Sequence, residues 1–188
     1  MNGLAAAKRV FAILDHEDVE DLASGHELRE VRGEVEFRDV SFGYREDREI
    51  LHAISFQVLP RQTVALVGAT GSGKSTLFQL LTRFYDPAKG FITLDGMPLS
   101  EVSKASLRQA VGYVTQEAFL FAGTVRENLR IAREDASDEA LWRALRLACA
   151  EDFVRAMPGG LDAEVGERGV LLSGGERQRL VMARAFLK

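Results

Sequence analysis

Strand-like alternation of apolar and polar residues marks the first half of the chain. Val35–Val40 and Ile54–Val58 alternate in this way, which predicts a pair of antiparallel strands with one buried face. Phe91–Leu94 is a further predicted strand, and the turn signal Asp95–Gly96 follows it directly. Gln62–Val67 is instead a continuous apolar stretch, which is the pattern of a parallel strand buried on both faces.

Helical spacing of apolar residues marks three later segments. Residues 103–110, 124–130 and 137–150 fit helices. One face of the last segment carries its apolar side chains, namely Leu141, Trp142, Leu145 and Ala148 or Cys149. Because this face is apolar along its whole length, we expect Trp142 to contribute to the core rather than to a cofactor site.

The N-terminal residues differ in character from those that follow. Apolar residues recur at helical spacing in 1–14, and acidic residues crowd 15–32, so we expect a helix and then a charged linker. The folded core is expected to begin near Glu34. No run of about twenty apolar residues occurs, so the sequence predicts no membrane-spanning helix in this chain.

Composition excludes several classes of function. A length of 188 residues predicts one domain, and 46% hydrophobic residues suffice for a sizeable core. The net charge of −4 argues against a nucleic-acid partner, because nucleic-acid-binding domains usually carry a basic patch. The histidines are scattered and lack metal-ligand spacing. Cys149 is the single cysteine, so no internal disulfide forms, and its apolar surroundings predict a small core residue.

A glycine-rich stretch follows the predicted parallel strand and fits the phosphate-binding pattern G-x-x-x-x-G-K-[ST]. It consists of Gly68, Ala69, Thr70, Gly71, Ser72, Gly73, Lys74, Ser75 and Thr76. The glycines let backbone N–H groups wrap around phosphate oxygens, and the N-terminus of the next helix adds positive charge. Lys74 can reach the β- and γ-phosphates of ATP, while the Ser75 hydroxyl can hold Mg²⁺. We therefore expect ATP and Mg²⁺ as cofactors.

A second glycine-bearing turn precedes another amphipathic helix further along the chain. It consists of Leu172, Ser173, Gly174, Gly175 and Glu176. By itself, such a turn is an ordinary helix N-cap about as often as it is an anion site. Together with the phosphate-binding stretch it resembles the signature motif of ATP-binding cassette (ABC) transporters, with Glu176 where Gln is also common. The resemblance implies a head-to-tail dimer with a second ABC domain, in which Lys74 and Ser173 contact different ATP molecules.

Further segments are similar to the same family. Ser41–Tyr44 resembles the aromatic loop, which implies that the Tyr44 ring stacks on adenine. Val111–Gln116 resembles the strand that enters the Q-loop, which implies that Gln116 lies beside Mg²⁺ and the attacking water. A strand-end aromatic and a solvated glutamine are the ordinary alternatives for these two side chains.

The resemblance assigns catalytic roles to Gln116 and Lys74 and Mg²⁺ ligation to Ser75 and Gln116. It favours the exporter subclass, because Phe119–Leu129 and Glu164–Gly169 resemble exporter segments. In exporters the second segment, here with Glu167 and Arg168, contacts a transmembrane domain. The implied function is to couple ATP binding and hydrolysis to substrate export, at the cytoplasmic face of the cell membrane.

The implied fold is α/β, with a P-loop NTPase (RecA-like) core, an antiparallel β subdomain and an α-helical subdomain at about residues 117–171. Residues 34–188 would form the ABC ATP-binding domain, and 1–33 the helix and charged linker from a preceding transmembrane domain. Lys188 comes before the family's Walker B strand, which ends in Asp-Glu. We therefore expect an incomplete sheet, no general base, and a 188-residue chain that is deficient in hydrolysis by itself.

Two other functions share these motifs. ABC-type ATPases of DNA repair and chromosome maintenance carry both glycine turns, but they predict long heptad stretches and basic surfaces, which 117–171 lacks. A non-catalytic nucleotide-binding fragment is the other alternative. The sequence does not reveal a transported substrate or distinguish a homodimer from a heterodimer, because specificity would lie in the transmembrane domain.

Overall fold

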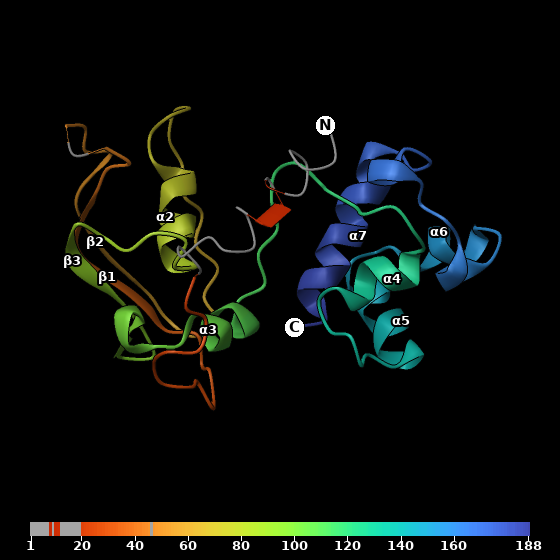
Figure 1. Ribbon diagram of the computed structural model, residues 1–188, viewed down its shortest axis with the longest axis horizontal. Coiled ribbons are helices and arrows are strands. Elements are labelled where there is room, and N and C mark those ends of the chain that lie inside the picture. Colours follow the sequence, from red (N-terminus) through yellow and green to blue (C-terminus); the bar gives the residue numbers. More distant parts are fainter. Residues whose placement is uncertain (1–7, 9, 12–19, 46) are drawn as a thin grey trace. The chain divides into compact units, whose positions relative to one another are not determined.

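The computed structural model describes residues 8, 10–11, 20–45 and 47–188. Two compact units make up the chain, Met1–Ser106 and Leu107–Lys188, and each is described by itself (Figure 1). Most of the predicted helix at 1–14 lies outside the described residues, and the three that are described have helical backbone.

An antiparallel four-stranded sheet dominates the first unit, in the order β2-β1-β3-β4 (Figure 1). Its strands are β1 (Val35–Phe42), β2 (Leu51–Val58), β3 (Lys89–Leu94) and β4 (Met97–Pro98). Val35 pairs with Val58 of β2 on one side and with Leu94 of β3 on the other. The rings of Phe37 and Phe56 stack across β1 and β2 with centroids 4.6 Å apart, which stabilises this register. The predicted antiparallel pair and the third strand are confirmed.

The turn between β3 and β4 has the backbone conformation that its sequence predicts. Asp95 and Gly96 have positive φ angles of 52° and 82°, as a tight two-residue hairpin turn requires. The Asp95 carboxylate accepts hydrogen bonds from three successive backbone N–H groups, those of residues 32–34. Burial works toward a higher pKa, but these N–H groups outweigh it and hold the pKa of Asp95 below its usual range. The turn therefore ties the chain before β1 to the sheet.

Part of the predicted linker is docked on the first unit. The N–H of His26 donates to the backbone oxygen of Glu101 at 2.7 Å, and its oxygen accepts from the N–H of Ser103 at 2.9 Å. These partners surround the junction between the 3-10 helix η1 (Leu99–Glu101) and helix α3 (Lys104–Ala110). The charged segment is thus held by backbone hydrogen bonds, which its composition did not predict.

The predicted buried strand at Gln62–Val67 is wrong. These residues form no strand, and Val67 is 94% exposed. A parallel strand requires neighbours that pair with its backbone N–H and C=O groups, and no strand among the described residues pairs with this segment. For the same reason the strand expected at Val111–Gln116 is absent, and Val114 lies exposed before Gln116.

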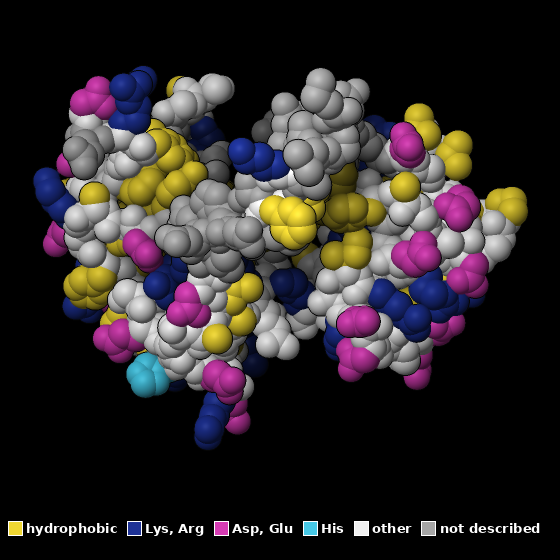
Figure 2. Space-filling model, viewed as in Figure 1, with side chains coloured by type: hydrophobic (Ala, Val, Ile, Leu, Met, Phe, Trp, Pro, Cys, Tyr) yellow, Lys and Arg dark blue, Asp and Glu magenta, His cyan; other side chains and the backbone are white. Residues whose placement is uncertain are grey.

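An apolar groove lies beside the unpaired segment in the first unit. Its volume is about 240 Å³, and hydrophobic side chains are open to solvent on the visible face of this unit (Figure 2). The groove is lined by Val35, Phe37, Phe56, Val58, Gln62, Val64, Leu66, Leu77, Phe78 and Leu81. The last three of these belong to α2 (Lys74–Leu81), so the sheet and α2 face each other across an incompletely filled space.

The second unit is helical. Its elements are α4 (Val125–Arg130), α5 (Asp138–Leu147), α6 (Glu151–Ala156), η2 (Gly160–Asp162), η3 (Glu167–Gly169) and α7 (Gly174–Phe186). Helices α4 and α5 pack against α7 around Leu129, Leu141, Leu145 and Leu180, which are almost completely buried. The helices predicted at 103–110 and 124–130 are confirmed. None of the described helices is long and apolar enough to cross a membrane.

The helix predicted at 137–150 ends earlier than expected, and the expectation for Cys149 is wrong. Helix α5 stops at Leu147, and Cys149 is exposed with a left-handed φ of 53°. This conformation reverses the chain before α6, so the neighbours Ala148 and Ala150 enter the core instead. Trp142 packs against the core as predicted.

Candidate nucleotide-binding site

The glycines of the phosphate-binding stretch are required by the backbone and by close packing. Gly71 and Gly73 have φ angles of 82° and 88°, where a side chain is strained. A Cβ on Gly73 would lie 2.7 Å from Cδ2 of the buried Leu51, and a Cβ on Gly68 would lie 2.7 Å from the Ser72 hydroxyl. The backbone conformation therefore favours glycine at residues 71 and 73, whereas a Cβ on Gly68 would displace only the Ser72 side chain.

Lys74 holds this loop in its curved form. Its Nζ donates to the backbone oxygens of Gly68 at 2.7 Å and Ala69 at 2.8 Å, and to the Ser72 hydroxyl at 3.3 Å. The loop thus encloses its own ammonium group, and the cation lies where the loop can present it to a bound anion.

Helix α2 begins directly at Lys74, and its N-terminus is open. Gly73 precedes the helix without a capping side chain, and the first turn contains no acidic residue. The first N–H groups of a helix carry partial positive charge and lack partners inside the helix. Ser75 is exposed in this turn, whereas Thr76 is only 5% exposed. The first turn therefore offers N–H groups and a hydroxyl to an anion.

Tyr44 lies at the second turn of the same helix. Its hydroxyl bonds to the Gln79 side chain and lies 3.2 Å from the Thr76 hydroxyl. Its ring meets Phe42 and Tyr85 at steep angles, with both pairs of centroids 5.2 Å apart. The Tyr44 side chain is 47% exposed, and neither neighbouring ring lies parallel to it, so part of it is accessible to a planar ligand.

The second predicted motif forms a capping box at the start of α7. Ser173 is the N-cap: its hydroxyl accepts from the N–H of Glu176 at 3.3 Å, and its own N–H donates to the Glu176 carboxylate at 2.7 Å. The hydrogen bonds from the Ser173 hydroxyl and N–H hold the pKa of Glu176 below its usual range. Gly174 and Gly175 are exposed, and Leu172 is buried in the core. The turn is thus rigid and open at its glycines.

The Arg177 side chain holds the same turn through hydrogen bonds to backbone oxygens. Its Nη1 donates to the backbone oxygen of Leu172 at 2.7 Å and to that of Gly169 at 3.3 Å. A Cβ on Gly169 would lie 2.8 Å from the Arg177 side chain. Glu167 is exposed at the start of η3, and the side chain of Arg168 lies outside the described residues.

Gln116 lies in an exposed bend of the second unit. Beside it, the Thr115 hydroxyl donates to the backbone oxygen of Glu117 at 2.6 Å, which closes the bend. Tyr44 and the phosphate-binding loop come together in the first unit, whereas Gln116 and the Ser173 turn belong to the second. Sequence reasoning missed Gln79 and Tyr85, although the spacing of Thr76 and Gln79 on α2 places both on one helix face.

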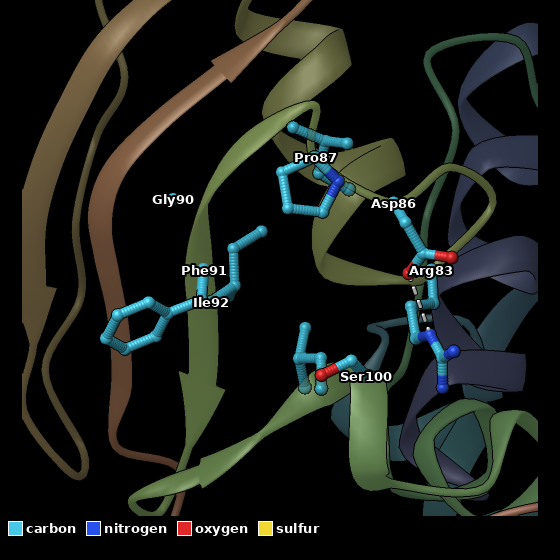
Figure 3. A pocket seen from close by; sticks show the side chains of 9 residues that line it. Arg83, Asp86, Pro87, Gly90, Phe91, Ile92 and Ser100 are labelled. Atoms are coloured by element: carbon cyan, nitrogen blue, oxygen red, sulfur yellow. Dashed lines mark hydrogen bonds and ion pairs between the residues drawn. The ribbon is translucent and has the colours of Figure 1, made fainter.

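A separate hollow of about 160 Å³ lies in the first unit and is lined by none of the predicted site residues (Figure 3). Phe91 and Ile92 of β3 border it, and Ser100 closes one end (Figure 3). Arg83 on its wall bonds to Asp86 at 3.0 Å and to the backbone oxygen of Val102 at 2.7 Å. These bonds engage the guanidinium within the protein, so the hollow offers little to a phosphate.

The ABC transporter family pattern matches residues 51–188, which contain the phosphate-binding loop, Gln116 and the Ser173 turn. The chain belongs to the ABC transporter family. This ABC chain is 43% identical over 187 residues to the uncharacterized ABC transporter ATP-binding protein YwjA of Bacillus subtilis strain 168. It is 47% identical over 187 residues to the ATP-dependent lipid A-core flippase of Legionella pneumophila strain Paris. Each alignment covers 99% of this chain and 32% of the relative.

The structure of a bacterial Atm1-family ABC exporter with ATP bound superposes on the ABC chain with a TM-score of 0.87. The two are 43% identical, and the match covers 99% of this chain and 33% of that chain. The α/β fold of an ABC ATPase domain and the resemblance to exporters are thereby confirmed. The chain spans about a third of the length of these relatives.

Proposed function

We propose that this chain is the ATP-binding part of an ABC exporter. The observation that carries the proposal is the loop around Lys74, whose ammonium group, curved backbone and uncapped helix N-terminus lie together in the first unit. The relatives support the exporter class, since one is named a lipid A-core flippase and another is an ABC exporter with ATP bound. The substrate of this protein is left open.

The residues of the first unit would hold the nucleotide through its two ends. The N–H groups of the loop and of α2 would bind phosphate oxygens, and Lys74 would exchange its bonds to the loop oxygens for bonds to phosphate. The hydroxyl of Ser75 would hold Mg²⁺, which would supply positive charge to the phosphates. Tyr44 would stack on adenine. Its exposure and its position beside α2 support this role.

Gln116 and the Ser173 turn, which both belong to the second unit, are assigned further roles in nucleotide binding. We assign Gln116 to Mg²⁺ and the attacking water. Leu172, Ser173, Gly174, Gly175 and Glu176 are assigned to the ATP of a second ABC domain. The open glycines and rigid capping box of the turn support this assignment, because exposed N–H groups at a helix start bind anions. A head-to-tail dimer attached to a transmembrane domain would lie at the cytoplasmic face of the membrane.

Hydrolysis requires a general base, and neither of the two carboxylates considered for this role is free at the nucleotide site in the described residues. The Asp95 carboxylate is engaged by three N–H groups of the chain before β1, and Glu117 belongs to the exposed bend at Gln116. We therefore propose that the 188-residue chain by itself binds nucleotide but does not turn it over. The full-length exporter would act as an ABC-type ATPase.

Binding of Mg²⁺-ATP, measured by isothermal titration calorimetry, tests the proposal. We expect binding by the unaltered protein and at least about tenfold weaker binding after Lys74→Ala, because a charge-assisted contact to phosphate is lost. The matched control is Lys89→Ala, an exposed lysine of β3 that pairs with Glu49. Equal affinity of the Lys74 and Lys89 variants would contradict the proposal, and DNA-stimulated ATP turnover would favour the DNA-repair class instead.

A further inference from the structure

Tyr44 is the only predicted nucleotide contact of the first unit that lies outside the phosphate-binding stretch. It follows β1, and among the described residues none of its own loop bonds to its hydroxyl. The described contacts of its hydroxyl all lead to α2: Gln79 accepts its hydrogen bond, and Thr76 lies 3.2 Å away. The position of the ring is therefore tied to the helix that begins at Lys74.

The hydrogen bonds have a definite direction. A tyrosine hydroxyl carries one proton, and Tyr44 donates it to the side-chain oxygen of Gln79. The Thr76 hydroxyl must then donate to the Tyr44 oxygen. Thr76 is buried and Gln79 is partly buried, so neither partner rotates freely into solvent. Gln79 is thus the terminal acceptor of a short chain of hydrogen bonds.

The neighbouring rings restrict Tyr44 but do not select one orientation. Phe42 and Tyr85 each meet it nearly edge-on, at 86° and 82°. Apolar edge contacts of this kind are weakly directional, whereas a hydrogen bond to a fixed acceptor is strongly directional. Of the described contacts, the hydrogen bonds to Gln79 and Thr76 therefore set where the ring lies relative to α2, and Gln79 is the one that accepts the Tyr44 proton.

We propose that Gln79 is a positioning residue for nucleotide binding, which holds the Tyr44 ring where a base can stack while α2 binds the phosphates. The inference rests on the proposed function. It identifies Gln79 as a determinant of affinity for the base and not for the phosphates. A base is bound more tightly when the ring that receives it is already held in place, because less freedom is lost on binding.

The affinities for two ligands distinguish binding of the base from binding of the phosphates. Mg²⁺-ATP carries both groups and Mg²⁺-tripolyphosphate carries phosphates alone, and each is titrated by calorimetry into the full-length exporter. Gln79→Met keeps the length of the side chain and removes the acceptor. We expect this variant to bind ATP about three- to tenfold more weakly, as the loss of one hydrogen bond implies, and to bind tripolyphosphate with unchanged affinity. Gln79→Glu keeps an acceptor, so the ratio of the two affinities should return toward that of the unaltered protein.

A second variant tests the route of the effect. Tyr44→Phe keeps the ring and removes the hydroxyl, and with it the bonds to both Gln79 and Thr76, so it should lower the affinity for ATP relative to tripolyphosphate at least as much as Gln79→Met does. The double variant should be no worse than Tyr44→Phe alone, because that change already removes the bond to Gln79. Additive losses in the double variant would overturn the proposal.

The remaining outcomes distinguish this inference from the function on which it rests. If Gln79→Met weakens both ligands equally, Gln79 acts on the shape of α2 and the inference is wrong. If it leaves the ratio unchanged or tightens ATP, the bond does not prepare the ring and the inference is also wrong. In both cases the proposed function stands, provided that Lys74→Ala still weakens ATP. Failure of the unaltered protein to bind either ligand would overturn both.

Discussion

The guanidinium of Arg184 is bonded to Asn128, although these residues lie on different helices. Its Nε donates to the Asn128 backbone oxygen at 2.7 Å, and its Nη2 donates to the side-chain oxygen. Asn128 is 1% exposed and also bonds to the backbone N–H and oxygen of Phe121, both at 2.9 Å. Arg184 further donates to the oxygen of Phe119 at 2.7 Å. The helix that begins with the Ser173 turn is thereby fastened to the loop that follows Gln116.

Removal of one partner should destabilise the second unit strongly. Asn128→Ala removes a side chain that is 1% exposed and takes its hydrogen bonds away from the Phe121 backbone and the Arg184 guanidinium, so we expect a loss of about 2–4 kcal/mol in the free energy of unfolding. Urea denaturation measures this loss. The control is Arg143→Ala, which changes an exposed residue of α5 and should cost less than about 0.5 kcal/mol. Similar midpoints for the two variants would show that the network contributes little.

Acid should weaken the contact between α5 and α6 through Glu151. Hydrogen bonds from Arg146, and then from Arg155, lower the pKa of Glu151 to about 2. A lowered folded-state pKa means that the stabilisation is complete above the unfolded value near 4.5 and is lost as the pH falls toward about 2. Comparison of unfolding against pH for the unaltered protein and Glu151→Gln checks this. Their difference in stability should shrink across this window, and a constant difference would contradict the assignment.

Ser173→Ala tests whether Ser173 acts only as the N-cap of α7 or also contributes to ATP turnover. Loss of the N-cap should cost about 1 kcal/mol of stability. Ser137→Ala is a matched control, because Ser137 caps α5 and accepts from the N–H of Ala140 at the same 3.3 Å distance. We expect similar losses of stability in both variants, with a fall in the ATP turnover of the full-length exporter only for Ser173→Ala. Equal turnover in the two variants would restrict Ser173 to a structural role.

Gly73→Ala should impair the phosphate-binding loop. It combines a strained φ of 88° with a Cβ 2.7 Å from the buried Leu51, so the loop must change shape. A distortion that costs about 1–2 kcal/mol would lower the affinity for Mg²⁺-ATP by roughly tenfold, as measured by calorimetry. Gly96→Ala is the control, since its φ is 82° but its Cβ would meet open space away from the loop. It should lower stability without changing affinity.

Exposed apolar surface should make the 188-residue chain associate when it is expressed alone. Val67 is 94% exposed, and Phe78 and Val64 on the apolar groove are 45% and 44% exposed. Such surface favours contact with other chains. We expect binding of the dye ANS and concentration-dependent light scattering. A soluble monomer with a cooperative thermal transition would refute this expectation.

Local patterns predicted part of the fold. The antiparallel strands, the helix at 124–130 and the Asp95–Gly96 turn were predicted because alternation, helical periodicity and turn chemistry depend on neighbouring residues. The curved backbone at Gly71 and Gly73 was predicted for the same reason, since their positive φ angles are a property of the loop itself. The strand predicted at Gln62–Val67 does not form, because a parallel strand depends on partners far away in the sequence, and none of the described strands pairs with this segment.

The sequence by itself determined the family and the two glycine-bearing turns, at Gly68–Thr76 and Leu172–Glu176, since each depends on a few residues at short spacing. Only the tertiary structure decided that Gln79 accepts the hydrogen bond of Tyr44 and that Arg184 is bonded to Asn128. It also decided that Cys149 faces solvent. These contacts join residues that are distant in the chain or depend on where a helix ends, and periodicity carries no information about which side chains then meet.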